Sequence, residues 1–531
     1  MRHACVLIAP SAIALLVGCP SNNSVECRDQ TSCDLAPGGV CVPAATGNQW
    51  CAYPDSTCPG GLRYSDGNIG DGLAGTCVES DVDAAIDAPD GPPTDGPPID
   101  GNTATDWVET FGDGMEDSAY AAIGPDGSVY VAAAFSGTIM VGSTTLTATH
   151  GVDVAVAKFT PTGTVAWARR YGGTLDDKPG GIVVDASGNP IIAGEFYSSI
   201  DFGGGTLNSA GTADIFVAKL NGADGSHAWS KRYGGNAGDR AKRIAIDGAG
   251  DIAVAGLFSG TVSLGGTDLT SSGSLDVFIA KYAGSNGSHV WSRAVGTNST
   301  TETAAGVAFV GTDVVFVGEF QGAGAYGGPV VMSAGAADIV VARYAGNNGA
   351  HLWSARHGGT SQDAALGVAA SGTSSIYVVG EFSGMASLGG PTLSSAGLAD
   401  AFAAKYDAAT GSHIWSKQFG GTTGDRLVSA SATSSGNLLA GGWFSGAAAV
   451  GSTTINSAGG IDSFLVELAT GTGDVVTTSS FGGVNEDYLT TVTSTGTRAV
   501  LAGMFRGSSS FYGFTKTSNG DFDGFVVSHA F

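Results

Sequence analysis

Short runs of apolar, β-branched residues separated by glycine-rich turns recur along the chain from Trp107 onward. One copy shows the pattern well: RIAID begins at Arg243, DIAVAGLF at Asp251, DVFIAKY at Asp276 and HVWSRAV at His289. Runs of this length and composition, bounded by Gly, Asn, Asp and Ser, predict β-strands. The SNGS segment between the last two runs predicts a tight hairpin, because Asn-Gly accepts the positive φ angles of such a turn.

The strand pattern repeats with a fixed period. The aspartate that opens the third run of each copy recurs at separations of 61 or 62 residues, and phenylalanine and tryptophan series run beside it. The three series are Asp153, Asp214, Asp276, Asp338, Asp400, Asp462 and Asp523; Phe135, Phe196, Phe258, Phe320, Phe382, Phe444 and Phe505; and Trp107, Trp167, Trp229, Trp291, Trp353 and Trp415, with Thr477 where the next tryptophan is expected. Four antiparallel strands per copy and a period above 40 predict the blades of a β-propeller. A longer segment between the second and third strands predicts a small hairpin at the rim.

The two ends of the repeated region predict how the ring closes. The chain enters on a fourth-type strand, DWVETFG from Asp106, and leaves on a third-type strand, DGFVVSHAF from Asp523. We expect these strands to pair in the seventh blade, which would cover both edges. The predicted fold is therefore all-β: a seven-bladed β-propeller over residues 106–531, closed by N- and C-terminal strands and preceded by a small disulfide-rich module.

The start of the chain has the pattern of an export signal. It begins MRH, continues with a short apolar stretch and reads LVGC up to Cys19. The apolar stretch is too short to span a membrane as a helix, and LVGC resembles the bacterial lipobox. Residues 1–18 are thus predicted to be a lipoprotein signal peptide, with lipid attachment at Cys19 and membrane association through that lipid. The alternative is a general secretory signal with a spare Cys19. Pro20 after the cysteine resembles lipoproteins of the outer membrane or cell surface, and the leaflet stays open.

Two further segments separate this signal from the repeats. Residues 19–78 form a predicted cysteine-rich module, because six cysteines follow Cys19 and an exported chain meets an oxidising compartment. We expect three disulfides among them, with 15 connectivities open; zinc is a weaker alternative, since no Cys-x-x-Cys and no histidine occurs there. Residues 79–105 are rich in Pro, Gly and Asp and predict an acidic, semi-rigid spacer. The six cysteines are Cys27, Cys33, Cys41, Cys51, Cys58 and Cys77.

Composition and charge narrow the class of partner. The chain has 86 Gly and only 13% charged residues, which fits many short strands joined by turns. Its formal net charge of −25 argues against nucleic acid or an anionic lipid surface as a partner, because both would be repelled. No basic patch is evident in the sequence. We expect a monomer whose partner is an envelope protein or a polysaccharide.

The repeat also resembles a known family. The pattern Asp-x-Phe-x-Ala-Lys-Tyr, then Gly and Trp, then Tyr-Gly-Gly and Asp, with IVVDASGNPIIAGEF in the second copy, is similar to the bacterial SBBP-type β-propeller repeat of exported cell-surface proteins. The resemblance covers residues 106–531. It implies a propeller fold and a surface location, and it brings no shared catalytic residues. The fourth copy departs from the pattern, because VGTNSTTET stands where Gly-Gly and the later aspartate are expected.

A second series of aspartates precedes the first strands. Antiparallel order places the starts of first and third strands on the same face, so up to thirteen carboxylates are predicted to encircle it. They could form a cation- or glycan-binding surface, or they could cap turns and pair with nearby cations. We favour the structural interpretation, because a residue that is repeated in every blade usually stabilises the fold of each blade. The series is Asp117, Asp177, Asp239, Asp363, Asp425 and Asp487; the cations are Lys231, Arg232, Arg240, Arg293 and Arg426.

A histidine series and a lysine and arginine series are two further candidate sites. Equivalent positions of neighbouring sheets lie about 10 Å or more apart, whereas zinc needs nitrogens within about 2.1 Å of one centre, so neither series can share an ion. DAATGSHIW, from Asp407 to Trp415, resembles the core motif of quinoprotein propellers, but no cofactor-binding residues accompany it. DGSHAW, from Asp224, resembles the sialidase Asp-box only loosely. We therefore predict no metal site and no cofactor. The series are His227, His289, His351 and His413, and Lys158, Lys219, Lys281, Arg343 and Lys405, which we expect to extend along the strand surface.

Three glutamates in GEF triplets, Glu195, Glu319 and Glu381, are the best candidates for glycoside hydrolysis. Such chemistry needs two carboxyl groups about 5 to 9.5 Å apart, one with a raised pKa. Polar strand ends explain them more simply, and no nucleophile elbow, phosphate loop or His-Glu-x-x-His motif occurs. The leading hypothesis is a non-catalytic, lipid-tethered envelope protein whose propeller loops bind a protein or polysaccharide. The alternatives are a glycoside-cleaving propeller enzyme and a purely structural surface protein.

Overall fold

The computed structural model describes residues 40–43, 49–54, 62–64, 106–112, 118–296, 302–496 and 498–531. The chain divides into two compact units, Met1–Thr103 and Ala104–Phe531. In the first unit, β1(Val40–Pro43), β2(Gln49–Pro54) and β3(Leu62–Tyr64) form an antiparallel sheet in which Cys41 lies opposite Cys51 in the backbone register. The predicted lipid attachment at Cys19 and the disulfides concern residues and side chains outside those described.

Every element in the described part of the second unit is a strand, and the strands form seven antiparallel blades of four. The first strand of each blade is the innermost. In chain order the blades are β5(Ser118–Ile123), β6(Val129–Phe135), β9(Asp153–Phe159), β10(Val165–Tyr171); β11(Asp177–Val184), β12(Pro190–Phe196), β15(Asp214–Leu220), β16(His227–Gly235); β17(Arg240–Ile246), β18(Ile252–Phe258), β21(Asp276–Tyr282), β22(His289–Val295); β23(Glu302–Val310), β24(Asp313–Phe320), β27(Asp338–Tyr344), β28(His351–Gly359); β29(Asp363–Ser371), β30(Ser375–Ser387), β31(Leu393–Asp407), β32(His413–Gly421); β33(Arg426–Ala432), β34(Leu438–Val450), β35(Thr453–Leu468), β36(Val475–Gly483); and β37(Asp487–Thr495), β38(Arg498–Phe511), β39(Phe514–Ala530), β4(Trp107–Phe111).

The hairpins predicted between second and third strands are present at the rim. In the last three blades their arms are continuous with the long strands of the blade, which is why β30, β31, β34, β35, β38 and β39 are long. In the first four blades they are separate pairs: β7(Thr138–Val141) with β8(Thr144–Thr147), β13(Ser199–Ile200) with β14(Leu207–Asn208), β19(Thr261–Ser263) with β20(Leu269–Thr270), and β25(Ala323–Gly324) with β26(Val331–Met332).

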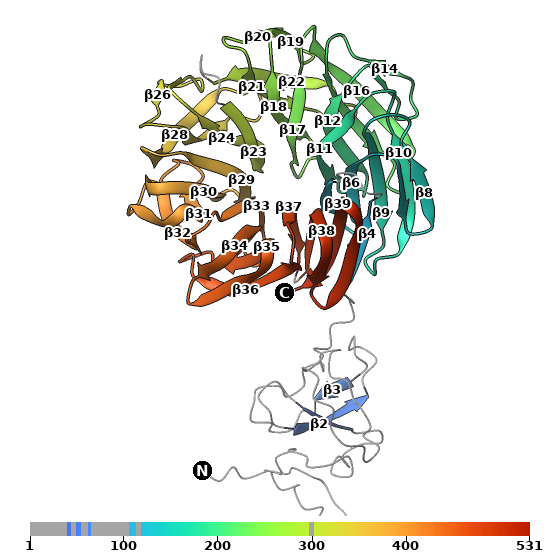
Figure 1. The fold of residues 1–531 in the computed structure, drawn as a ribbon, viewed down its shortest axis with the longest axis vertical. Helices are drawn as coiled ribbons and strands as arrows, with labels where there is room; N and C mark the ends of the chain where they lie inside the picture. The colour runs from blue at the N-terminus through green and yellow to red at the C-terminus, as the bar shows by residue number, and fades with distance from the viewer. Residues whose placement is uncertain are drawn as a thin grey trace, which may run out of the picture. The chain divides into compact units, whose positions relative to one another are not determined.

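The seven blades close into a ring. Each first strand contacts the first strand of the next blade, from β5 through β11, β17, β23, β29 and β33 to β37, and β37 in turn contacts β5. Figure 1 shows these strands facing a common centre, with the remaining strands of each blade further out. The repeated unit is therefore a β-propeller, as the strand pattern predicts.

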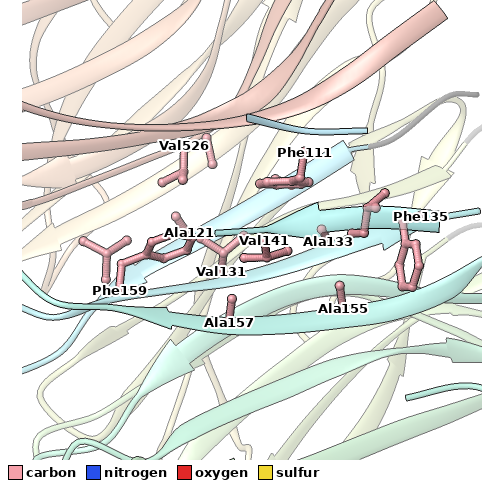
Figure 2. Packing of buried hydrophobic residues seen from close by; sticks show 14 of the residues in the cluster. Phe111, Ala121, Val131, Ala133, Phe135, Val141, Ala155, Ala157, Phe159 and Val526 are labelled. Carbon is pink, nitrogen blue, oxygen red and sulfur yellow. The ribbon is translucent and has the colours of Figure 1, made fainter. Parts of the chain in front are cut away.

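The termini complete the seventh blade, which confirms the predicted closure. β4 pairs with β39 over five residue pairs, from Trp107 opposite Ser528 to Phe111 opposite Gly524. Phe111 and Val526 of this blade lie in one core with Val131 and Phe159 of the first blade, as Figure 2 shows. The N-terminal strand thus contributes to the packing of two blades.

The tryptophan and lysine series tie each blade to the next. Each indole N–H donates to a main-chain carbonyl in the hairpin between the third and fourth strands of the following blade, at 3.0 to 3.3 Å. In four blades the Lys or Arg of the third strand donates to that same carbonyl, as Lys405 and Trp415 do to Thr470. The cation series thus holds blades together rather than merely lying along the strands.

The ring closure explains why the tryptophan series stops before Thr477. Thr477 lies on the outer strand of the sixth blade, and the seventh blade has the two chain ends where the other blades have a hairpin. Tyr512 of the rim hairpin links these two blades instead: its hydroxyl lies 3.1 Å from Ser479 Oγ, and its ring stacks on His529 with centroids 3.7 Å apart. Asp106 accepts hydrogen bonds from His529 Nδ1 at 2.6 Å and from the Ala530 amide at 3.0 Å.

A Trp415→Phe change should cost about 1 kcal/mol of unfolding free energy, because it removes one hydrogen bond and leaves the ring in place. Trp415→Ala should cost about 3–5 kcal/mol, because it also empties a buried site. Denaturant unfolding followed by far-UV circular dichroism, which reports on the backbone rather than on tryptophan, would measure the unfolding free energy of both variants. An alanine variant as stable as the unchanged protein would contradict the role of this series in joining blades.

Candidate functional site

Both aspartate series lie on the face of the propeller where first and third strands begin, which we call the aspartate face. In the second blade, Asp177 and Asp214 are both register partners of Phe196, one from each side. All twelve described members are buried, at most 4% exposed. Asp117 lies outside the described residues. The carboxylates therefore meet on one face, as predicted, but below its surface.

The third-strand aspartates cap the end of the rim hairpin. Each accepts a hydrogen bond from the backbone N–H four residues earlier, in all seven blades. In three blades an arginine of the fourth strand also pairs with it: Arg170 with Asp153, Arg232 with Asp214 and Arg356 with Asp338. These contacts support the structural interpretation of the series.

The first-strand aspartates hold the connection between blades. Each of the five described members accepts the N–H of the second glycine of the preceding Gly-Gly pair. That glycine is required for close approach: a Cβ at Gly235 would lie 1.9 Å from the Thr261 carbonyl oxygen of the next blade. The recurring Gly-Gly and Asp motif is thus an inter-blade turn rather than a ligand site.

Burial raises the pKa of these five carboxyl groups, and the facing third-strand aspartate raises it further. The pKa rises to about 7 for Asp177 and Asp487. It rises to about 6 for Asp239, Asp363 and Asp425. Their backbone hydrogen bonds act in the opposite direction but do not cancel burial.

In the fourth blade a glutamate takes the place of the missing aspartate. Glu302 is the register partner of Phe320, just as Asp363 is the register partner of Phe382 in the next blade. Glu302 is buried, and its carboxylate would be 2.1 Å from a Cβ at Gly296. The divergent turn itself includes residues 297–301, which are outside the described residues.

The four histidines each begin the fourth strand of a different blade. Each Nε2 atom lies 3.0 or 3.1 Å from the hydroxyl of the serine three residues later, for example His289 and Ser292. Among the described residues, no group of three or more His, Cys, Asp or Glu side chains is arranged to hold a metal ion. Each histidine thus makes its hydrogen bond within its own outer strand.

The glutamates of the GEF triplets reach to the next blade. Glu195 pairs with Arg240 at 2.9 Å, Glu381 pairs with Arg426 at 3.0 Å, and Gln362 donates to Glu319 at 3.2 Å. Burial raises the pKa of Glu319, and the charge of Glu381 adds to this rise. Arg240 and Arg426 thus pair with glutamates, and the prediction that they pair with aspartates is wrong. These contacts are inter-blade ties on the aspartate face.

A row of aromatic and arginine side chains breaks the repeat on the aspartate face. The Arg426 guanidinium lies 4.1 Å from the ring centroid of Trp443; Trp443 contacts Tyr488 edge-on at 5.4 Å; and Tyr488 lies 5.7 Å from Phe522. Arg506 lies over Phe522. The three rings, here called the aromatic row, are each partly exposed. Residues equivalent to Trp443 in the other blades are Ala134, Glu195, Leu257, Glu319, Glu381 and Met504.

The axis of the ring holds only a small cavity. Its volume is about 150 Å³, and residues of the first strands line it. This volume is below the range of about 300–1,000 Å³ that is typical of ligand pockets. Arg243 is its one charged lining residue among those described. The surface of the aspartate face is therefore a better place for a partner than the axis.

Comparisons with known proteins give a coarse result. No family model matches the chain. An uncharacterized WD repeat-containing protein of Acanthamoeba polyphaga mimivirus is 25% identical over 187 residues, which are 30% of this chain and 13% of that protein. Solved structures with similar folds include a chain of the mitotic checkpoint complex, with a TM-score of 0.42, 10% identity and coverage of 84% of this chain and 99% of that one. BamB from Moraxella catarrhalis has a TM-score of 0.34, 11% identity and coverage of 80% and 100%.

The region from Ala104 to Phe531 is thus a β-propeller, and its strand pairing carries that conclusion. The structural likenesses are distant and add no argument about function. The resemblance to SBBP-type repeats stays a prediction. Within the described residues, no helix has the length and hydropathy needed to cross a bilayer.

Proposed function

We propose that this chain is a non-catalytic, monomeric protein of the cell envelope. In this proposal it is anchored by a lipid at Cys19, and its propeller binds a protein or polysaccharide partner. The LVGC sequence, the cysteines and the acidic spacer support the anchor, with the outer membrane or cell surface as its place. The aromatic row is the main observation in favour of a binding role. The repeated side chains stabilise the fold, whereas the aromatic row departs from the repeat.

The aromatic row has the chemistry of a binding surface. Partly exposed Trp and Tyr side chains and arginines contribute most to binding energy at interfaces. The charges around the row are already paired: Arg426 with Glu381, and Arg506 with Glu486 and Asp521. The row therefore offers apolar contact area and hydrogen-bonding groups without a strong net charge, which suits the surface of a protein or the face of a sugar ring.

Capture of partners from envelope extracts tests this role. The propeller is expected to retain a partner whose affinity falls at least tenfold in Trp443→Ala, because central aromatic residues commonly contribute more than 1 kcal/mol to binding. Met385→Ala is the matched control, since Met385 is an apolar side chain that is 69% exposed on a rim hairpin. Equal retention by both variants, at equal thermal stability, would contradict the aromatic row as the binding surface.

A further inference from the structure

Three cations gather on one innermost strand of the aspartate face. Arg240, Lys242 and Arg243 all lie on β17, and Arg240 and Lys242 pair with the buried Glu195 of the second blade. Glu195 lies 2.9 Å from Arg240 and 3.9 Å from Lys242. Lys178, the register partner of Glu195, adds a fourth positive charge beside them. We call Arg240, Lys242 and Arg243 the β17 cluster.

Lys242 occupies a position of β17 whose counterparts in five other blades line the axial cavity, and its own ammonium group lies 3.9 Å from Glu195. The pairing of β17 with β18 shifts register between Ala241 and Arg243, so Lys242 is the extra residue of a β-bulge. Bulges change the direction of a side chain and are common beside binding sites. Five other blades have the same bulge, and the equivalent residues are uncharged: Gly180, Ala305, Leu366, Val428 and Thr490. All five line the axial cavity.

The β17 cluster is not neutralised within the described residues. The hydrogen bonds of Arg243 go to main-chain carbonyls, from Nε to Ala305 at 2.8 Å and from Nη1 to Lys242 at 2.9 Å. Burial lowers the pKa of Lys242, and the charges of Arg240, Arg243 and Lys178 lower it further against the opposing effect of Glu195. Arg240 and Lys242 therefore share one buried carboxylate, and Arg243 makes no ion pair among the described residues, in a chain whose formal net charge is −25.

Such a cluster costs folding free energy, because like charges repel one another where water is partly excluded. The fold does not need it, since the other bulges hold neutral residues. A cluster that carries more positive than negative charge beside a small cavity has the chemistry of an anion site, because guanidinium and ammonium groups are strong N–H donors to anions.

We propose that the β17 cluster binds a single anionic group, a carboxylate, sulfate or phosphate, carried by a ligand that is otherwise uncharged. A polyanion is disfavoured, because the acidic protein would repel its remaining charges. The assignment rests on the proposed function, since it lies on the same face, and it adds the chemistry that the partner must present. The ligand group would sit against Lys242 and Arg243, beside the opening of the axial cavity.

Thermal unfolding of the full chain in sulfate, phosphate or galacturonate tests the proposal. One of these probes is expected to raise the melting temperature in a saturable way at millimolar concentration, whereas chloride at matched ionic strength does not. Which probe acts distinguishes the three groups. Lys242→Gln should abolish this rise, and Lys242→Arg should keep it. Lys417→Gln, which removes a partly exposed cation that pairs with Asp474 on an outer strand, should respond like the unchanged protein.

The unliganded variants separate a binding role from a structural one. Without added anion, Lys242→Gln should melt about 1–3 °C higher than the unchanged protein, because the repulsion within the cluster is relieved. A lower melting temperature with an unaltered anion response would overturn the proposal, as would a rise in chloride equal to that in all three probes. If the unchanged protein shows no rise in any of the three probes but still captures its partner, the anion site is overturned and the aromatic row stays the proposed binding surface.

Discussion

Deleting residues 106–111, which removes β4, is expected to lower the melting temperature by about 10 °C or more. The deletion exposes the edge of β39 and takes Trp107, Val108 and Phe111 out of the core. Burying three large apolar side chains stabilises a fold by roughly 5–9 kcal/mol. The effect extends to the first blade, because Trp107 donates to the Pro161 carbonyl and stacks on Phe159 at 5.3 Å.

Differential scanning calorimetry of the shortened and full chains would measure this loss. Deleting residues 81–100 of the predicted spacer is the matched control, and it should leave the melting temperature unchanged. The shortened propeller is also expected to associate through its open strand edge. An unchanged melting temperature after loss of β4 would mean that the ring does not depend on its terminal strand.

Acidification gives the second large effect: the propeller should be more stable near pH 5 than at pH 8. The pKa of Asp177 and Asp487 is about 7 in the folded protein, and that of Asp239, Asp363 and Asp425 is about 6. A carboxyl group whose pKa is raised by folding stabilises the fold when protonated, and this stability is lost as the pH rises through the folded value. Each pKa unit corresponds to about 1.4 kcal/mol, and partial hydration reduces the sum to several kcal/mol.

One histidine acts in the opposite direction. Burial lowers the pKa of His357 to about 4, so its contribution is lost as the pH falls below its ordinary value of 6.5. Because five carboxyl groups oppose it, we expect a stability maximum in weakly acidic solution.

Asp425→Asn tests the source of this pH dependence. Oδ1 of Asp425 and Oδ1 of the facing Asp400 are buried without a hydrogen-bond partner among the described residues. An amide at position 425 removes the titration and keeps an acceptor for the Gly421 amide. The variant should lose less stability than the unchanged protein between pH 5 and pH 8. A thermal melt series with the same slope for both would contradict the assignment.

Most of the fold could be predicted because each copy of the sequence repeat corresponds to one set of four strands. The period, the four strand-like runs and the phase of the two ends give the strand order of each blade and the pairing of β4 with β39. The roles of repeated side chains were harder to predict. Spacing alone shows that Trp415 and Lys405 recur, but only coordinates show that both donate to the Thr470 carbonyl of the next blade.

The candidate site could be predicted much less well, because it consists of exceptions to the repeat. The sequence does show that GWF, with Trp443, replaces the GEF of other copies. It does not show that Trp443 contacts Tyr488, because these residues belong to two different blades. The same holds for the β17 cluster: a chain with a net charge of −25 gives no sign that two cations meet at Glu195 with a third beside them. Net charge is a sum, whereas a site depends on local arrangement.

The pairing of β4 with β39 also has a mechanical consequence. If the N-terminal segment tethers the protein, any pull on that tether reaches the propeller first at Asp106 and Trp107. Asp106 is fastened there to His529 and to the Ala530 amide, and Trp107 is fastened to the next blade. The strand that shuts the ring would then bear the load, and its unzipping force would set how much tension the molecule withstands before it opens.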